Sequence, residues 1–384
     1  MHEELLDRRA DYPILARKTY LISNSLGAMH RGTRDRLSRY ADEWESCGVA
    51  AWRDWIPEAV RIADLVGEIL GAPAGSTVLR ASVADLLPTV ASCLDFTGRR
   101  NRIVYSDLEW PGSSYFWTEQ ARYGAEPIVV PISDDGVNVD IDRLVAAIDD
   151  RTLLVPISHV LFRASTLLDV APVVARAREV GALVLLDAYQ SAGSVPVDVT
   201  ALGVDFCVGG SVKYLSGGPG AGWMYVRPDL VETLRPAAVG WFGHADTFAF
   251  EFAPVRYAPG IRRFTGGTPN VPAAYAAEPG YRGILDAGVT RIRERSMSLT
   301  QPLLEEALAR GFTVRSPHDP ARRGGHVTVD PGDAQRVHDV LHQRGFAVDY
   351  RPGAGLRLAP HFYNTAEEGA AVLEEIARIR KEIG

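Results

Sequence analysis

Lysine is rare in this chain, and one lysine stands where chemistry is expected. The 41 basic residues include only Lys18, Lys213 and Lys381, and arginine supplies the rest. Lys213 lies in DFCVGGSVKYLSGGPGAGW, just past an apolar strand and before a glycine-rich turn. An ordinary surface lysine is the alternative, but arginine would serve equally well there. Because an amine can form a Schiff base and a guanidinium cannot, the pattern favours a Schiff-base lysine of the kind that binds pyridoxal phosphate.

A carboxylate follows another apolar strand. Asp187 ends the strand expected in GALVLLDAYQSAG, which places it at the mouth of the sheet. A pyridoxal ring needs an acidic partner that keeps its nitrogen protonated. The alternative is a helix N-cap, a position that aspartate also fills well. Together with Lys213, Asp187 is predicted to face the ring nitrogen of the cofactor.

Two segments could hold a phosphate group. The sequence SGGPGAG, residues 216–222, could cradle it through backbone amides, or could be a tight turn that leads into GWMYV. Ser82, in VLRASVADLLPTV, follows a short strand and opens a helix. A helix N-terminus with a hydroxyl is a ready anion site, and a plain N-cap is the alternative.

Two larger side chains complete the candidate site. Trp110, in SDLEWPGSSYFW, follows the strand RIVY and could stack on a planar cofactor, with a core tryptophan as the alternative. Arg357, in GLRLAPHFYNT, lies in an apolar strand, where a guanidinium needs a partner. That partner is either an internal carboxylate or the α-carboxylate of an amino-acid substrate. The scattered histidines lack zinc-motif spacing, so no metal site is predicted.

The elements that position these residues follow from an alternation of strands and helices. Between 76 and about 230, the strands RIVY, PIVV, LLVPI, ALVLL, FCVG and GWMYV are separated by helical stretches such as IDRLVAAID and VAPVVARAREVG. The alternation predicts an α/β domain with a mostly parallel sheet between helices. In open sheets of this class, ligands bind beyond the carboxyl ends of the strands, which is where Asp187 and Lys213 fall.

The two ends of the chain read differently. Near the N-terminus, TRDRLSRYADEW and PEAVRIADLVGEIL are helical, with Pro57 expected in a first turn. From about 285, the long helix VTRIRERSMSLTQPLLEEALARG precedes the strands HVTV, AVDY and LRLA and the helices QRVHDVLHQRG and AEEGAAVLEEIARIRK. We predict a helical arm with part of a small domain over residues 1–60, a large domain over 61–285 and a small α+β domain over 286–384. The first helices are expected to pack against the small domain or a second subunit.

Composition argues against several classes of protein. Hydrophobic residues make up 46% and charged residues 23%, which is globular rather than disordered composition. No apolar run approaches the roughly 18 residues of a membrane helix, and no signal peptide is recognisable, so a cytoplasmic protein without membrane contact is expected. The net charge of −7 argues against nucleic-acid binding. Cys47, Cys93 and Cys207 are odd in number and far apart, as suits a reducing compartment.

Taken together, these motifs resemble the class V branch of the fold-type I pyridoxal-phosphate enzymes, and within it kynureninase. The resemblance extends from about Tyr20 to the end of the chain. It rests on the order and spacing of YLISNSLG, AAWRDWIPE, EWPGSSYF, HVLFRAS, LDAYQSAG, VKYLSGGPG, GWFGH, FTGGTPN, RRGGHVTV and LRLAPHFYN. It implies the fold-type I architecture, with a mostly parallel sheet of the seven-stranded type in the large domain and a small C-terminal α+β domain.

The resemblance also implies a role for each matching residue. Lys213 carries pyridoxal 5′-phosphate and is the catalytic residue. The other residues implied to bind the cofactor are Ser82, Val83, Trp110, Asp187, Gln190, Trp241 and Thr268. Trp241 and Thr268 match residues that such enzymes lend to the phosphate of a neighbouring subunit, which implies a homodimer with shared sites. The residues implied to bind the substrate are Asn24, Trp52 and Arg357.

Four positions depart from the kynureninase pattern. Val212 stands where kynureninases carry a tyrosine that bonds the phosphate and is placed to move protons. Gln190 replaces a histidine, Ser113 replaces an acid, and Tyr189 replaces a small residue that packs beneath the ring. Losing titratable groups changes which proton transfers are possible, so kynurenine hydrolysis itself is in question while the cofactor assignment stands. Tyr189 could supply a displaced phenol.

The resemblance implies an enzyme that acts on a β-substituted L-amino acid, with kynureninase-like hydrolytic Cβ–Cγ cleavage that releases L-alanine. The alternative is another class V reaction, catalysed by a C–S lyase, an aminotransferase or an epimerase. A persulfide-forming desulfurase is disfavoured because the small domain has no cysteine. A cofactor-binding protein without catalysis is opposed by the intact Lys213, Asp187 and Arg357. A nucleotide-dependent oxidoreductase is opposed by the lack of a Gly-x-Gly-x-x-Gly motif.

Overall fold

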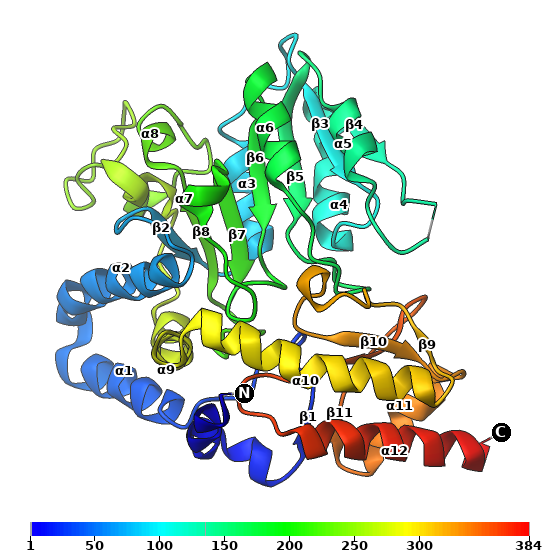
Figure 1. Cartoon of the computed structure of the whole chain (residues 1–384). Helices are drawn as coiled ribbons and strands as arrows, with labels where there is room; N and C mark the ends of the chain where they lie inside the picture. Colours follow the sequence, from blue (N-terminus) through cyan, green and yellow to red (C-terminus); the bar gives the residue numbers. More distant parts are fainter. Residues whose placement is uncertain (1, 135, 384) are drawn as a thin grey trace.

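The large sheet has seven strands, and its architecture was correctly predicted as mostly parallel. The computed structural model describes residues 2–134 and 136–383 (Figure 1). The strand order is β2-β8-β7-β6-β5-β3-β4, and only β8 runs antiparallel to its neighbours in the described chain. The strands are β2 (Thr77–Arg80), β3 (Arg102–Ser106), β4 (Glu126–Val130), β5 (Thr152–Ser158), β6 (Leu183–Asp187), β7 (Phe206–Gly210) and β8 (Gly222–Val226).

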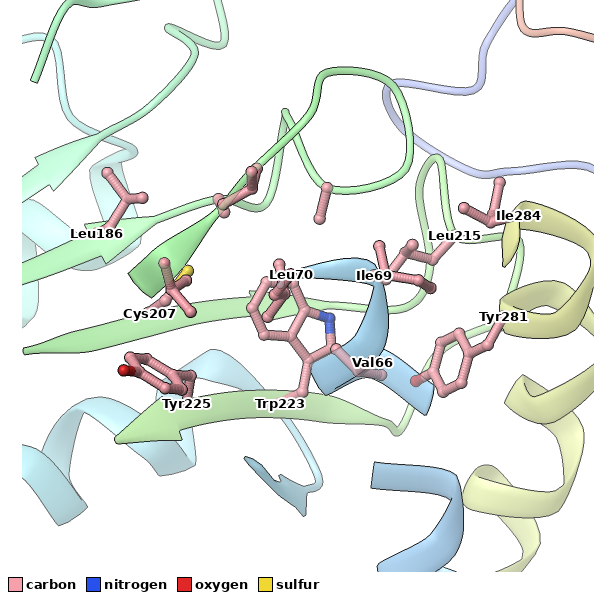
Figure 2. Close-up of a cluster of buried hydrophobic side chains, with 14 of the residues drawn as sticks. Val66, Ile69, Leu70, Leu186, Cys207, Leu215, Trp223, Tyr225, Tyr281 and Ile284 are labelled. Carbon is pink, nitrogen blue, oxygen red and sulfur yellow. The ribbon is translucent and has the colours of Figure 1, made fainter. Parts of the chain in front are cut away.

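Helices cover both faces of this sheet, because its strands carry apolar side chains on both sides. One apolar cluster joins the sheet to α3 (Val83–Ala91) and α4 (Pro111–Glu119). The cluster on the other face includes α5 (Ile141–Ala147), α6 (Ala171–Val180), α2 (Trp52–Ile69) and α9 (Val271–Ala287). Figure 2 shows part of this second cluster, where Trp223 of β8 packs beside Val66 and Ile69 of α2. The short helices α7 (Val199–Leu202) and α8 (Pro228–Val231) lie in connections.

The C-terminal part has its own antiparallel sheet and its own core. The strands β9 (Thr313–Val314), β10 (Val327–Asp330), β12 (Asp349–Arg351) and β13 (Gly355–Leu358) pair in the order β12-β13-β10-β9. Helices α10 (Val289–Ala309), α11 (Ala334–Gln343) and α12 (Ala366–Ile383) complete it (Figure 1). Leu21, from the N-terminal segment, belongs to the same apolar cluster. The domain bounds at 60 and 285 stay a prediction.

One predicted strand is divided in the structure. AVDY was expected as a single strand, but its residues belong to two sheets. Strand β11 (Phe346–Ala347) pairs in parallel with β1 (Thr19–Tyr20), whereas β12 begins at Asp349 in the four-stranded sheet. The buried Val348 separates the two pairings. A single apolar run therefore serves two partners, which a pattern of alternation cannot show.

The first helices differ from one of the two expected arrangements. Within the single chain, helices α1 (Thr33–Cys47) and α2 pack on α9 rather than on the small domain, and their packing against a second subunit stays a prediction. Helix α2 also begins at Trp52, so Pro57 lies inside it rather than in its first turn. Trp52 and Trp55, in the turn before Pro57, pack edge to face with ring centroids 5.2 Å apart.

Short 3-10 helices connect the larger elements. They are η1 (Glu3–Asp11), η2 (Pro13–Ala16), η3 (Gly48–Ala51), η4 (Gln120–Tyr123), η5 (Trp241–Gly243), η6 (Gly260–Phe264) and η7 (Pro320–Arg322). Among the described residues, no helix combines the length and apolar character needed to cross a bilayer.

Candidate active site

The loop after β7 holds Lys213 at the carboxyl edge of the sheet. The Ser211 amide donates to the carbonyl of Ala221, at 3.1 Å, and the Gly27 amide donates to the carbonyl of Val212, at 2.7 Å. A β-carbon on Gly27 would overlap the Lys213 carbonyl oxygen, so this close approach of two backbones requires glycine. Loss of hydration lowers the pKa of Lys213 to about 7, although the charge of Asp187 opposes the shift. The amine is therefore partly unprotonated at neutral pH.

Asp187 ends the neighbouring strand β6, as predicted. Its register partners are Ser158 of β5 and Val208 of β7. Its Oδ1 accepts a hydrogen bond from the Tyr189 amide, at 2.9 Å. Burial raises the pKa of this carboxyl, while the Tyr189 amide and the charge of Lys213 act in the opposite direction. The carboxyl group of Asp187 and the amine of Lys213 thus lie at the ends of two adjacent strands.

A pocket of about 380 Å³ brings most of the predicted residues together. A volume of this size suits a small-molecule ligand. The predicted residues that line it are Asn24, Val83, Trp110, Asp187, Gln190, Lys213 and Arg357. Ser82 adjoins it as the extended residue before α3. The fold therefore places residues from six separate segments around one amine.

Three predicted residues lie outside this pocket in the single chain. Trp52 packs against Phe242, with ring centroids 5.8 Å apart. Trp241 stacks on Phe250, with centroids 5.7 Å apart, and its indole N–H donates to the carbonyl of Thr247. Thr268 is exposed. Their roles in substrate binding or at a neighbouring subunit's phosphate stay predictions.

Arg357 has the internal carboxylate that was one of its two predicted partners, and its binding of a substrate carboxylate stays a prediction. Its Nη2 pairs with Asp349 and its Nη1 donates to the Phe162 carbonyl, at 2.8 Å. Arg351 also pairs with Asp349, at 2.6 Å, and lines the pocket with Arg357. Nε of Arg357 has no partner among the described residues. The pair of guanidiniums shares one carboxylate, which leaves a positive charge for the carboxylate of a ligand.

The polar groups of the pocket fit pyridoxal phosphate. Both amide atoms of Asn24 and Oε1 of Gln190 are buried without a hydrogen-bond partner in the described chain. Such atoms are costly unless a ligand or water satisfies them. A buried acid, an amine with a lowered pKa and an indole ring stand beside them. These are the groups that a protonated ring nitrogen, an aldehyde and a planar heterocycle require.

The residues predicted to bind the phosphate, Ser82 and Val83, lie at the start of α3. The Ser82 hydroxyl donates to Oδ2 of Asp85, at 3.0 Å, while Val83 at the start of α3 lines the pocket. The amides at this helix start are suited to an anion. The segment 216–222 does not line the pocket, and its residues Ser216, Gly218 and Gly220 have positive φ. These backbone angles fit the tight turn, and phosphate binding by this segment stays a prediction.

Sequence reasoning missed a buried acid next to Asp187. Glu109 is only 3% exposed and accepts a hydrogen bond from the Ser158 hydroxyl. Burial raises the pKa of Glu109 to about 8, and the charge of Asp187 contributes to the same shift. The position of Glu109 directly before Trp110 was the available signal. Arg351 was also missed, because its approach to Arg357 depends on the hairpin of β12 and β13.

The fold and the site define a fold-type I enzyme of the pyridoxal-phosphate class. Residues 58–368 match the aminotransferase class-V family, and the chain belongs to this family. The family uses pyridoxal 5′-phosphate as its cofactor.

Relatives with full-length similarity carry different names. An uncharacterized aminotransferase of Bacillus subtilis (strain 168), YcbU, is 31% identical over 366 residues, which is 95% of each chain. A kynureninase of Bacillus anthracis is 28% identical over 383 residues, covering 96% of this chain and 89% of the relative.

Solved structures share the fold. The apo cysteine desulfurase of Thermococcus onnurineus NA1 superposes with a TM-score of 0.87 at 22% identity, covering 98% of each chain. A mutant of C-DES with glycine covalently linked to its PLP cofactor gives a TM-score of 0.87 at 21% identity, covering 96% of this chain and 98% of that one. At these identities the likeness defines the architecture alone.

Proposed function

We propose that this PLP-dependent enzyme cleaves the side chain of a β-substituted L-amino acid, by kynureninase-like hydrolysis of the Cβ–Cγ bond with release of L-alanine. The observation that carries the proposal is the meeting of Lys213, Asp187 and Arg357 in one pocket. The similarity to kynureninases over nearly the whole chain supports it.

Each of these residues has a distinct task. When bound, pyridoxal phosphate supplies an electron sink that weakens bonds at Cα and Cβ of an attached amino acid. Arg357 binds and orients the α-carboxylate. Lys213, with a pKa of about 7, can take a proton from Cα and return it at neutral pH. Asp187 would hold the proton on the ring nitrogen of the bound cofactor, and Trp110 would pack on its ring.

A second candidate, a carbon–sulfur lyase, has one observation in its favour. Hydrolysis at a γ-carbonyl needs a group that activates water. Within the described pocket lining, the titratable side chains are Asp187, Tyr189, Lys213 and the two arginines. Val212 has no proton to give or take. Elimination of a sulfur leaving group needs only the Cα proton transfer that Lys213 performs.

Product identification separates the two candidates. Purified holoenzyme is incubated with kynurenine, 3-hydroxykynurenine, cysteine and cystine, and alanine, anthranilates, pyruvate and sulfide are measured. Alanine with an anthranilate supports the hydrolase. Pyruvate with a sulfur product, and no alanine, replaces it with the lyase. The variant Lys213→Ala should lose the visible band of the bound cofactor and all turnover, whereas Lys381→Ala, at an exposed lysine, should keep both. Retention of both by Lys213→Ala would overturn the cofactor assignment.

The enzyme is further proposed to be a homodimer whose partner supplies Trp241 and Thr268 to the phosphate. Trp241 contacts the exposed rings of Phe248 and Phe250, and such an exposed aromatic patch is typical of an interface. If sites are shared, mixing inactive Lys213→Ala with inactive Thr268→Ala subunits should restore activity, because each heterodimer contains one intact site. About a quarter of wild-type activity is expected from random reassociation of a two-fold dimer. No recovery in mixed dimers would contradict shared sites.

A further inference from the structure

Two aromatic rings flank the amine of Lys213. Its Nζ lies 4.1 Å from the centroid of the Tyr189 ring and 5.7 Å from the centroid of the Trp110 ring. Both rings line the same pocket. A cation within about 6 Å of a ring centroid is attracted by the ring, so both rings lie close enough to attract the amine when it is protonated. A planar group bonded to Nζ begins at this point, close to both rings.

The two rings have different surroundings. The phenol end of Tyr189 lies against the α-carbon of Gly210, the last residue of β7, so this ring rests on the edge of the sheet. The side chain of Trp110 lies on the open side, where it remains 43% exposed and packs edge to face on Phe162, with ring centroids 5.0 Å apart. A group attached to Lys213 thus enters a space that both rings line.

Gly210 leaves room for the Tyr189 ring. A β-carbon at position 210 would overlap Oη and Cζ of Tyr189 and lie 2.9 Å from Cε2. These three atoms are the nearest neighbours of that β-carbon, and all belong to Tyr189. The Tyr189 amide is also fixed to Asp187, at 2.9 Å. Tyr189 therefore contacts β7, the strand that precedes Lys213, through its ring, and it contacts Asp187 through its backbone amide.

The phenol of Tyr189 stays neutral over the physiological range. Loss of hydration, together with the charge of Asp187, raises the pKa of Tyr189 to about 12. The aromatic face, rather than an ionised oxygen, is what this side chain presents to a ligand. A small residue at position 189 would leave that face of a planar ligand against the backbone alone.

We propose that Tyr189 is a second aromatic wall of the cofactor site, so that the pyridine ring of the bound aldehyde is stacked between Tyr189 and Trp110. The lack of a side chain at Gly210 leaves the space that the Tyr189 ring occupies. This inference rests on the proposed role of Lys213 and adds a residue that binds the cofactor. Its ligand is a planar, electron-poor heterocycle, which two electron-rich rings stabilise better than one.

The test measures cofactor binding, not turnover. The dissociation constant of pyridoxal phosphate is determined by titration of the absorbance and visible circular dichroism of the reconstituted full chain. Tyr189→Phe keeps the ring and should bind within about twofold of wild type, whereas Tyr189→Ala should weaken binding by about tenfold, the factor expected for one stacked aromatic pair. Tyr123→Ala, at an exposed tyrosine in η4, is the matched control and should bind as wild type.

A double-mutant cycle tests whether the Tyr189 ring needs the space at Gly210. Gly210→Ala should displace the Tyr189 ring and weaken binding by a similar factor, but should add little in the Tyr189→Ala background, because the overlapping atoms are gone. If Gly210→Ala fails to fold, the comparison of Tyr189→Phe with Tyr189→Ala decides alone. Wild-type binding by Tyr189→Ala, or equal weakening by Phe and Ala, would overturn the aromatic wall. Neither result touches the cofactor assignment, which fails only if Lys213→Ala keeps the bound cofactor band.

Discussion

Asp349 and Arg357 face each other as register partners on β12 and β13, and their side chains form a buried ion pair at the edge of the active-site pocket. Asp349 is 3% exposed and Arg357 is 1% exposed. Asp349 also holds Arg351, so one carboxylate positions two guanidiniums. The pocket is therefore built for one further negative charge, which matches a single α-carboxylate.

Replacing Asp349 should remove the ion pairs that position Arg351 and Arg357. In Asp349→Asn, the buried Arg357 loses its counter-charge, and breaking such a pair destabilises the fold by about 3–5 kcal/mol. The KM for the amino-acid substrate should rise because Arg357 is no longer oriented. Denaturant unfolding and steady-state kinetics measure the two effects. Asp339→Asn, at an exposed aspartate on α11, is the control. A variant as stable as wild type would show that the pair does not hold the strands together.

Close backbone contact between Gly27 and the Lys213 loop gives a second prediction. Gly27→Ala places a β-carbon on the Lys213 carbonyl oxygen and 2.8 Å from Oγ of Ser216. Because the overlap is with backbone, the loop itself must move, at a cost of about 1–3 kcal/mol. Cofactor affinity should fall with stability. Gly98→Ala has space for its methyl group and serves as the comparison. Unchanged cofactor binding by Gly27→Ala would mean that this contact does not position Lys213.

The position of the sheet residues could be predicted from the sequence because strand ends are local features. Asp187 and Lys213 each follow an apolar run, and parallel strands bring their carboxyl ends to one edge. Trp110 and Val83 follow β3 and β2 in the same way. These four residues meet in the pocket for that reason.

Other parts of the structure depend on contacts that the sequence does not display. The helix α9 has no polar face to reveal it, since most of its residues are buried and Pro279 interrupts its pattern. The pairing of Arg351 with Asp349 depends on side chains that meet at a hairpin. Likewise, a tyrosine at position 189 indicates a departure from a family pattern, but its place over Gly210 depends on the register of β6 and β7.

The reactivity of Lys213 provides a third prediction, which the scarcity of lysine makes easy to measure. Since desolvation lowers the pKa of Lys213 to about 7, its amine should react with an amine-directed reagent in the apoenzyme with a rate that rises through about pH 7 and then levels off. Peptide mass spectrometry follows Lys213 separately from the exposed Lys18 and Lys381. At neutral pH, Lys213 should be labelled faster than Lys18 and Lys381 once each rate is divided by the accessibility of that amine. A rate that continues to rise well above pH 8 would contradict the lowered pKa.

Glu109 gives the fourth prediction, a dependence of stability on pH with a defined sign. Burial raises the pKa of Glu109 to about 8, so the folded protein keeps a proton that the unfolded chain releases near its ordinary pKa. The stabilisation is complete below the unfolded pKa and is lost as pH rises to about 8, with a slope of at most about 1.4 kcal/mol per pH unit.

The variant Glu109→Gln keeps a neutral, hydrogen-bonding side chain and has no such proton. Its free energy of unfolding should therefore increase relative to wild type between about pH 5 and pH 8, and the difference should become constant above that range. Urea unfolding of the holoenzyme at several pH values measures it, with Glu119→Gln, at the exposed end of α4, as the control. If the difference between Glu109→Gln and wild type is flat across this range, Glu109 is ionised in the fold. A second negative charge would then stand beside Asp187, and the hydrogen bond from Ser158 would be the interaction that stabilises it.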